Sequence, residues 1–447
     1  MAERETPRKK VPLESIALKK QELFVSLAIL MQWVILCNIV FLYFGFPKVY
    51  LAAVVPCCII LLLKIKFKKP NFHHILKLTY FFSIIFTTLL HLIIYHQQDF
   101  SRAFYGLMIY ILFPAFWFLM SLCISDAEIF LKNVFWRLRY LIVAASILGL
   151  VQYFVSPMLF GLVKEDMSRI FSFAANSTAS LGDYFRVSSL WLSPQICGLF
   201  LSLYIIGYYT FMEHNLSTFL TLLPCVFCGV LSFNKSFFLN MFLLFLCKIK
   251  ISFLTKSLLV IAGILCLISV SLDNPDSKAH GRILSIDRII EEETLEDSRL
   301  NIYQKKLSEC CFWGNGIGII QNTAAYNSEN VAESFLLQVL YEIGVIPFVL
   351  LLLIIFRQYF TSPPKMRLLL FAAYLSMLYV HAFNSIYMAL YYSLLFLDFS
   401  PKRRQDSKSV DCNPASVMPE DELSEKSRQI VFKDMSENKG KACSVLP

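Results

Sequence analysis

The stretch NVAESFLLQVLYEIGVIPFVLLLLIIF, residues 330–356, carries two acids at the start of and within a long apolar run. From Ser334 onward it is long enough to cross a bilayer, because a transmembrane helix needs about 20 mostly apolar residues. Glu333 stands at its entrance and Glu342 lies inside it. A carboxylate at membrane depth costs about 2.5 to 3.5 kcal/mol. Glu342 and Gln338, four residues apart, share a helix face, which should therefore turn toward a polar bundle interior.

The composition places the chain in a membrane rather than in water. Of its 447 residues, 57% are hydrophobic, 15% are aromatic and 16% are charged, with a mean hydropathy of +0.60. Soluble domains carry about 25% charged residues. The sequence therefore predicts an all-α, polytopic membrane protein with about 12 transmembrane helices. The spans are expected at residues 24–46, 49–63, 78–95, 103–124, 139–157, 189–212, 216–232, 236–250, 257–272, 334–356, 366–382 and 384–398.

Positive charge recurs in alternate loops and orients the bundle, because Lys and Arg in short loops stay on the cytoplasmic side. Both termini should be cytoplasmic, with residues 1–23 as an N-terminal segment and residues 399–447 as a disordered tail. The bundle would cover residues 24–398, with two longer outer loops at residues 158–188 and 273–333. The net charge of +9 is thus an orientation signal rather than a nucleic-acid footprint. The predicted cytoplasmic basic groups fall within residues 4–20, 64–77, 132–139, 248–256, 357–367 and 402–404.

The outer loop 273–333 contains a segment that is predicted to form an amphipathic helix on the bundle. Its two lysines, Lys305 and Lys306, are expected on a solvated face, as exposed mixed charge usually is. The sequence WGNGIG, residues 313–318, should end the helix with a sharp turn in which glycine lets the chain approach the membrane closely. The apolar residues that recur at spacings of three and four are Leu300, Tyr303, Leu307 and Cys311.

Three cations lie at the outer ends of predicted spans or helices: Arg186, Lys235 and Arg299. Several fixed positive groups at an outer membrane surface suit a pyrophosphate, which Arg grips as a fork and Lys meets as a point charge. For Arg186 and Lys235 the alternative is that the side chain snorkels to lipid headgroups. For Arg299 the alternative is a place on the solvated face of the amphipathic helix.

Metal and nucleotide chemistry are not indicated by the sequence. The glycines of GNGIG lack the spacing of a nucleotide-binding loop. No CxxC or HxxxH pairing suggests a zinc site, and the adjacent Cys310 and Cys311 are poorly placed to bridge each other. We therefore expect no metal and no cofactor.

Four motifs follow one another along the chain. They are RVSSLWLSPQICGLFL (186–201), NKS (234–236), SRLNIYQKKL followed by GNGIG (298–318), and ESFLLQVLYEIGVIP (333–347). Their order, spacing and topology resemble those of the O-antigen polymerase and O-antigen ligase superfamily of bacterial envelope glycosyltransferases, over about residues 140–360. The chain departs from that pattern at Ser189, where a glycine is common, and at Lys235, where arginine is usual.

The resemblance implies an inverting, metal-independent transferase with a GT-C-like fold in the bacterial inner membrane and an active site on the periplasmic side. Its donor would be a glycan on undecaprenyl pyrophosphate, and its acceptor a sugar hydroxyl on another lipid-linked molecule. Arg186, Lys235 and Arg299 would hold the pyrophosphate, and Arg299 would also stabilise it as the leaving group. Arg282 and Arg288 are further candidates for binding acceptor or phosphate.

Glu333 falls where ligases of this superfamily have a histidine. That departure favours a polymerase, in which Glu333 would act as general base on the acceptor hydroxyl. The alternative is a first-turn acid favoured by the helix dipole. The competing functions are an O-antigen ligase that transfers the glycan to lipid A core, and a flippase or transporter for the same lipid carrier. The expected partners are lipid-linked oligosaccharide, membrane lipids and a candidate chain-length regulator, with no nucleic acid.

Overall fold

The computed structural model describes residues 13–37, 49–65, 72–94, 106–107, 110–111, 113–124, 126–155, 180–181, 184–185, 187–191, 194–248, 299–317, 334–378 and 388–399. The helices are α1 (Leu13–Leu36), α3 (Val49–Lys64), α4 (Phe72–Leu89), α6 (Phe113–Cys123), α7 (Ala127–Phe154), α9 (Pro194–Phe211), α10 (Leu216–Leu231), α11 (Lys235–Lys248), α15 (Arg299–Ser308), α16 (Phe335–Gln338), α17 (Val345–Thr361), α18 (Arg367–Ser376) and α19 (Ala389–Tyr392). The π-helical turns are η1 (Leu90–Ile94) and η5 (Val339–Ile343), and the 3-10 turns are η4 (Ser189–Trp191), η6 (Pro364–Met366) and η8 (Ser393–Leu395). Two-residue strands β1 (Ser180–Leu181) and β2 (Tyr184–Phe185) pair antiparallel.

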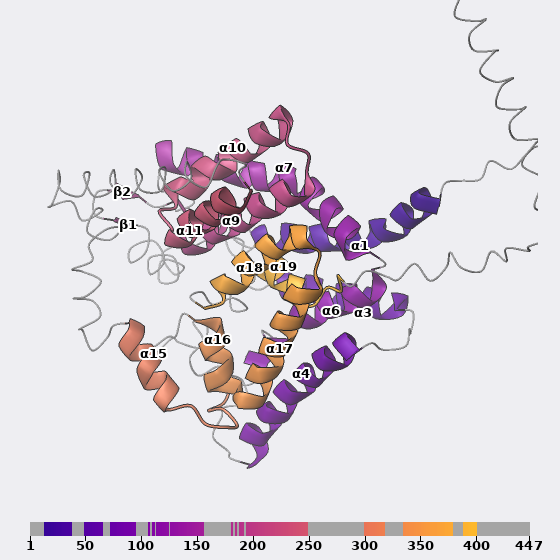
Figure 1. Ribbon diagram of the computed structural model, residues 1–447, viewed down its shortest axis with the longest axis vertical. Coiled ribbons are helices and arrows are strands. Elements are labelled where there is room, and N and C mark those ends of the chain that lie inside the picture. The colour runs from indigo at the N-terminus through magenta and orange to yellow at the C-terminus, as the bar shows by residue number, and fades with distance from the viewer. Residues whose placement is uncertain are drawn as a thin grey trace, which may run out of the picture. The chain divides into compact units, whose positions relative to one another are not determined.

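The helices between residues 13 and 399 pack into two groups (Figure 1). In the first, α9 contacts α7, α10 and α11, and in the second, α17 contacts α4 while α3 contacts α6. Between them, α18 touches α9, α11, α17 and α19. At Gly207 of α9 the ring of Phe135 from α7 fills the space of a side chain, since a Cβ there would lie 2.3 Å from the ring. Close approach of helices at glycine is a common packing device inside membranes.

Helix α4 shows how the sequence divides between bundle and surroundings. Large apolar side chains are exposed along one stripe, at Phe82, Ile85, Phe86, Leu89 and Ile93, while the opposite face is buried. An exposed apolar stripe of that length is suited to lipid rather than to water. Together with its apolar composition, this stripe suits α4 to a place in a membrane.

Three helices in the described parts of the chain are long and apolar enough to cross a membrane: Phe72–Ile93, Ala127–Phe154 and Pro194–Phe211. Shorter apolar helices occur at Gln21–Leu36, Ala52–Lys64, Pro114–Cys123, Leu216–Leu231, Lys235–Cys247 and Val345–Thr361. A helical protein with membrane-type helices is therefore what the structure gives, while a total of 12 spans stays a prediction. The span expected at residues 257–272, most of both outer loops and residues 400–447 lie outside the described residues.

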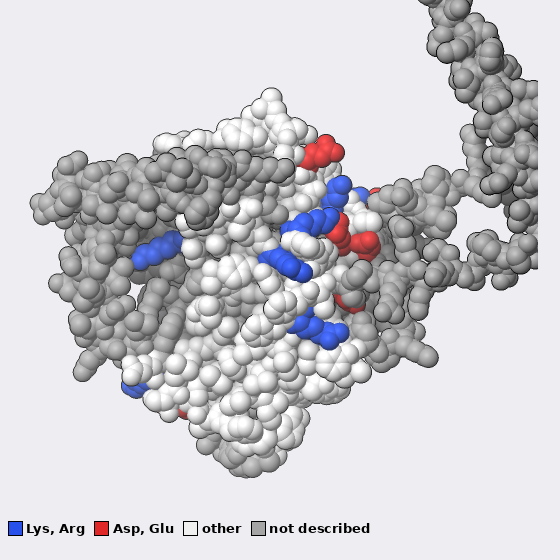
Figure 2. All heavy atoms as spheres, viewed as in Figure 1, with Lys and Arg blue, Asp and Glu red and all other residues white. Residues whose placement is uncertain are grey.

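Two ion pairs join predicted cytoplasmic groups at one edge of the bundle. Arg137 pairs with Glu22 at 3.1 Å, and Lys365 pairs with Glu128. Figure 2 shows charged side chains gathered along one edge of this face, next to a broad uncharged area. The first turn of α7 thus meets the turn after α17, which agrees with the prediction that both lie on the same side of the membrane. Which side of the membrane that edge faces stays a prediction.

The last expected span, residues 384–398, is helical in its described part only as far as Leu395. Residues 388–399 form α19, η8 and irregular chain, and they are largely buried. Backbone carbonyls in an apolar interior need donors where no helix supplies them. One donor is Lys77 of α4, whose Nζ lies 2.6 Å from the carbonyl oxygen of Phe396. The helix expected to reach residue 398 therefore ends at Leu395, and side chains from other helices pair the carbonyls around its end.

A second donor to this segment gives a stability prediction. Gln358 is fully buried, and its Nε2 donates to the carbonyl oxygens of Leu394 and Leu397 at 2.9 and 2.6 Å. A buried carbonyl left unpaired costs about 1 to 3 kcal/mol. We therefore expect Gln358→Leu to lower the midpoint of thermal unfolding of the purified protein. The control is Thr361→Val, since the exposed Thr361 hydroxyl bonds the Arg357 carbonyl of its own helix. Equal midpoints for the two variants would contradict the assignment.

Candidate functional site

The structure places two of the six residues predicted for the site. Lys235 is the first residue of α11 and its side chain is exposed. Arg299 is the first residue of α15. The other four predicted residues lie outside the described residues: Arg186, Arg282, Arg288 and Glu333. What the structure adds is the arrangement of the segments around them.

The first motif contacts the turn between α10 and α11. The Val187 N–H donates to the carbonyl oxygen of Leu231 at 3.1 Å, and the side-chain amide of Asn234 donates to the carbonyl of Gln195. A Cβ added at Gly198 would lie 2.4 Å from the Ser232 hydroxyl. Gly198, the glycine of the first motif, is thus the place where α9 packs closely against the turn that precedes Lys235.

Asn234 also begins the helix that Lys235 opens. Its Oδ1 accepts a hydrogen bond from the Ser236 N–H at 2.9 Å, which satisfies one of the donors left free at a helix start. Lys235 therefore begins a capped helix. The asparagine before it bonds to α9 through the Gln195 carbonyl and to the start of α11 through the Ser236 N–H. A cation held in this way has a defined place rather than the freedom of a loop residue.

Ser189 has an unusual backbone conformation, with φ of +49°. Non-glycine residues rarely adopt positive φ, which costs of order 1 kcal/mol unless the surroundings hold it. Here the Ser189 N–H donates to Gln152 Oε1 at 3.0 Å and its hydroxyl donates to the carbonyl of Ala145 at 2.5 Å. The position thus has the geometry of a glycine site, and two hydrogen bonds to α7 hold a serine in it.

The stretch expected as one continuous span from residue 334 is broken in the structure. Ser334 caps the short helix α16 by accepting from the Leu337 N–H at 3.3 Å, and the π-helical turn η5 follows. The chain then turns at Gly344, with φ of +99° and ψ of −176°, before α17 begins. We call η5 and Gly344 the junction. A single π turn within a helix is often found at functional sites.

The loop that follows α15 contacts the junction where the helix breaks. We call residues 312–317 the glycine loop. Its Asn315 N–H donates to the carbonyl of Tyr341 at 2.8 Å, and its Gly316 N–H donates to the carbonyl of Glu342 at 3.1 Å. In return, the Val345 N–H donates to the carbonyl of Phe312 at 2.9 Å. The backbone groups freed by the break are therefore paired with the glycine loop.

Two glycines make this contact close enough for backbone pairing. A Cβ at Gly314 would lie 2.4 Å from the carbonyl oxygen of Glu342, and one at Gly344 would lie 2.5 Å from that of Phe312. Both residues also have positive φ. The expectation of a sharp turn at the glycines of this loop is confirmed at Gly314 and Gly316, which have positive φ. The surface that Gly314 approaches is the backbone of the junction, and the expected approach to the membrane stays a prediction.

Glu342 points into the bundle, as its shared face with Gln338 predicted. Both side chains are fully buried. The Tyr110 O–H donates to Glu342 Oε2 at 2.9 Å, and the Tyr110 ring also lies beside that of Phe335, with centroids 6.2 Å apart. The prediction of a polar interior face is confirmed. Tyr110 was not predicted, because no local pattern connects two residues 232 positions apart.

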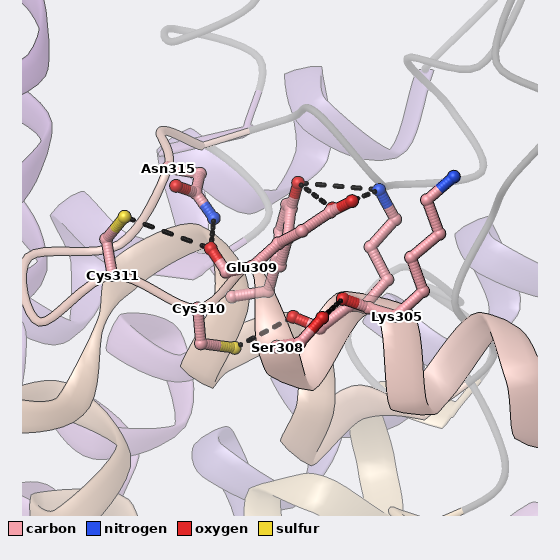
Figure 3. A network of polar contacts seen from close by, with 8 residues as sticks. Lys305, Ser308, Glu309, Cys310, Cys311 and Asn315 are labelled. Atoms are coloured by element: carbon pink, nitrogen blue, oxygen red, sulfur yellow. Dashed lines mark hydrogen bonds and ion pairs between the residues drawn. The ribbon is translucent and has the colours of Figure 1, made fainter.

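Tyr341, the neighbour of Glu342, points to α15 instead. Figure 3 shows the resulting network, in which Glu309 lies at the centre. Lys306 Nζ pairs with Glu309 Oε2 at 3.2 Å and lies 4.8 Å from the centre of the Tyr341 ring. The Tyr341 O–H donates to Glu309 Oε2 at 3.2 Å. Two consecutive side chains of the junction therefore have different partners: Tyr341 bonds to Glu309 after α15, and Glu342 bonds to Tyr110 in the core.

This network corrects the expected orientation of the amphipathic helix. Lys305 is exposed as predicted, but the Lys306 side chain is only 12% exposed, so its placement on the solvated face was wrong. Conversely Leu307 is 53% exposed, although the periodicity put it on the buried face. Lys306 can be largely covered because its ammonium group is paired with Glu309 and lies over the Tyr341 ring. Cys310 is half-buried, Cys311 is exposed and neither forms a disulfide.

The Lys306–Glu309 pair should make the attachment of α15 sensitive to acid. The hydrogen bond from Lys306 lowers the pKa of Glu309 below its ordinary value of 4.5. Because the pKa is lower in the folded state, the ionised carboxylate stabilises the attachment above pH 4.5, and this contribution is lost as the pH falls through the lowered pKa. For Lys306, burial lowers the pKa but the bonds to Glu309 and Tyr341 outweigh it and raise the pKa, so the lysine stays charged.

We therefore expect amide hydrogen exchange over residues 299–317, corrected for its intrinsic pH dependence, to accelerate as the pH falls from above 4.5 through the lowered pKa of Glu309. In Glu309→Gln the corrected exchange should be equally fast above pH 4.5 and below the lowered pKa of Glu309. Lys305→Ala, which changes the exposed neighbour, should behave as the unaltered protein. An undiminished response to pH in Glu309→Gln would contradict a role for this carboxylate.

No group of three or more His, Cys, Asp or Glu side chains within the described ranges is arranged to hold a metal ion. Neither a protein-family model nor a curated protein matches the sequence. The assignment of function therefore depends on the motifs and on the way the fold pairs them.

Proposed function

We propose that the protein is a polymerase of O-antigen or a related surface polysaccharide. It joins repeat units by transferring the growing glycan from undecaprenyl pyrophosphate to a sugar hydroxyl of a new lipid-linked unit. The observation that carries the proposal is the pairing of the four motifs. Val187, Gln195 and Gly198 contact the turn at 231–236, and the glycine loop contacts the junction. The first motif thus lies against the second and the third against the fourth, which supports reading them as parts of one site.

The geometry of Ser189 supports the same resemblance. The related pattern has a glycine where this chain has Ser189, and here φ of +49° is a conformation that favours glycine. The substitution is therefore a departure in sequence that keeps the local backbone shape. The hydrogen bonds to Gln152 and Ala145 explain how a serine is accommodated.

In the proposed reaction, Glu333 takes the proton from the acceptor hydroxyl as that oxygen attacks the anomeric carbon of the donor. A new glycosidic bond forms, and the bond between the anomeric carbon and the pyrophosphate oxygen breaks. Undecaprenyl pyrophosphate leaves with the bonding electron pair. Arg186, Lys235 and Arg299 bind the pyrophosphate and stabilise the negative charge that develops on it. Attack from the side opposite the leaving group inverts the anomeric centre.

Lys235 is the first residue of α11, directly after Asn234, whose side chain caps that helix. The positive end of a helix dipole adds to the charge of a cation placed there, which favours an anionic ligand. Arg282 and Arg288 are retained as further candidates for acceptor or phosphate binding. In this proposal the site faces the periplasm, with both chain termini in the cytoplasm of a bacterial inner membrane.

The test supplies the purified protein with lipid-pyrophosphate-linked repeat units and separates the products by size. A ladder of lipid-linked products of increasing length is expected. Transfer to added lipid A core without a ladder would instead identify an O-antigen ligase. Movement of lipid-linked units across vesicles without a new glycosidic bond would identify a flippase. Either of the last two outcomes would overturn the polymerase proposal.

A further inference from the structure

We propose that Glu342 and Tyr110 are positioning residues that hold both reactive ends of the proposed site in register. This inference rests on the proposed function for its catalytic consequence. The two side chains do not touch the substrate in this proposal. They fix the junction, which in turn fixes the helix that carries Arg299 and the helix that Glu333 precedes.

The first step is the two-sided geometry of the junction. Within the π turn, consecutive residues point to different partners. Tyr341 bonds Glu309 and contacts Lys306 on the α15 side. Glu342 is fully buried and accepts from Tyr110 on the core side. A displacement of Glu342 would therefore move Tyr341 and the network around it.

The second step is the backbone connection to α15. The carbonyls of Tyr341 and Glu342 accept the N–H groups of Asn315 and Gly316. The glycine loop follows α15 within a few residues, so its docking limits where α15 can lie. Arg299 begins that helix. The position of the start of α15, and so of Arg299, is thus set from the far end of the helix, through the loop.

The third step is the connection to Glu333. The Tyr110 ring lies against Phe335, the first residue of α16, and Tyr110 is fully buried. Ser334 caps that helix, and Glu333 is the residue before the cap. Tyr110 therefore contacts both ends of the α16 and η5 segment, at Phe335 through its ring and at Glu342 through its hydroxyl. Loss of that hydroxyl would leave the start of α16 free to shift relative to the junction.

Glu342 has an alternative role as a proton acceptor in the reaction itself, and the two roles differ in what they need. Positioning needs an oxygen that accepts from Tyr110, whereas proton transfer needs a carboxylate. Glutamine has nearly the shape of glutamate and keeps an accepting oxygen. Leucine keeps much of the volume but accepts no hydrogen bond. Glu342→Gln and Glu342→Leu therefore separate the two roles, and Tyr110→Phe removes the donor with the least change in shape.

The docking of the glycine loop can be measured independently of catalysis with the native thiols. Cys310 is half-buried and its thiol donates to the carbonyl of Lys306 at 3.2 Å, while its neighbour Cys311 is exposed. Pulse labelling of the full chain with a maleimide, followed by mass spectrometry of this peptide, gives the ratio of labelling at Cys310 to that at Cys311. Cys311 is the internal control for reagent access.

We expect Glu342→Leu and Tyr110→Phe to raise this labelling ratio and to lower kcat for polymerisation by about 10- to 100-fold, as misplacement of catalytic groups does. Glu342→Gln should leave the ratio and kcat close to those of the unaltered protein. An unchanged ratio in Glu342→Leu and Tyr110→Phe would overturn the positioning role. A loss of kcat in Glu342→Gln equal to that in Glu342→Leu would overturn it in favour of proton transfer. If the unaltered protein forms no polymer, the proposed function fails, and the labelling ratio still decides whether these residues hold the loop.

Discussion

Replacing Arg299 with alanine, or Glu333 with glutamine, should lower the rate of polymer formation by about 100-fold or more. Removing one group that stabilises charge in a transition state typically costs that much, and so does removing a general base. In Arg299→Ala the protein would lose a guanidinium group that binds and stabilises the pyrophosphate leaving group. Glu333→Gln would keep its shape but lose the ability to take the proton. The measurement is the initial rate of ladder formation from lipid-linked repeat units.

The matched control for Arg299→Ala is Lys305→Ala. Both change a cation of α15 to alanine, but Lys305 is an exposed residue of the solvated face. Its rate should stay within a few-fold of the unaltered rate, since an exposed charge outside a site contributes little. An intact ladder in Arg299→Ala or in Glu333→Gln would show that the mechanism assigned to that residue is wrong. If Lys305→Ala lowered the rate of ladder formation as much as Arg299→Ala, the overall charge of the helix would explain the effect and Arg299 would have no specific role.

The membrane character of the chain could be predicted because it depends on composition and on runs of apolar residues, which are local properties. The spans expected at residues 49–63 and 216–232 match α3 and α10 within two residues. Helix ends were harder to predict where apolar and polar chain are both helical. Helix α7 begins at Ala127, well before the expected start at residue 139, because Asp126 caps it by accepting from the Glu128 and Ile129 N–H groups.

The early end of the helix at Leu395 and the irregular chain at residues 396–399 could not be predicted from the local sequence. Its composition is that of a buried helix, and its exception depends on donors that come from elsewhere in the chain. Lys77 lies 319 positions from Phe396. A lysine between two predicted spans is read from the sequence as an orientation signal, since nothing local indicates that its ammonium group will be buried against a carbonyl.

In the candidate site, too, unusual local residues could be predicted from the sequence, whereas contacts between distant residues could not. The glycines of the loop and the acid inside the apolar run were both singled out, because each is unusual for its surroundings. Their contact was not predicted, because pairing the Gly316 N–H with the Glu342 carbonyl requires knowing that the helix breaks there. The sequence EIG shows that signal only weakly, through one glycine after a buried acid. Lys306 was misplaced because charge alone does not tell a solvated lysine from one paired over an aromatic ring.

Alanine in place of Gly344 should separate the glycine loop from the junction and destabilise the protein. With φ of +99° and ψ of −176°, Gly344 lies in a backbone region that is essentially restricted to glycine. The strain of another residue there is of order 1 to 3 kcal/mol. The added Cβ would also lie 2.5 Å from the Phe312 carbonyl oxygen and 2.7 Å from the Gly314 nitrogen. Both of these are backbone atoms, which cannot rotate away as a side chain does.

We therefore expect Gly344→Ala to lower the midpoint of thermal unfolding and to raise the labelling of Cys310 relative to Cys311. Gly314→Ala should act in the same way, since its Cβ would meet the Glu342 carbonyl oxygen from the opposite side of the contact. The control is Ile346→Ala, two residues further along the chain, where the side chain is 39% exposed. That change removes apolar surface without touching the loop, so the labelling ratio should not move. A ratio in Gly344→Ala equal to that in Ile346→Ala would mean that the close backbone contact does not hold the loop in place.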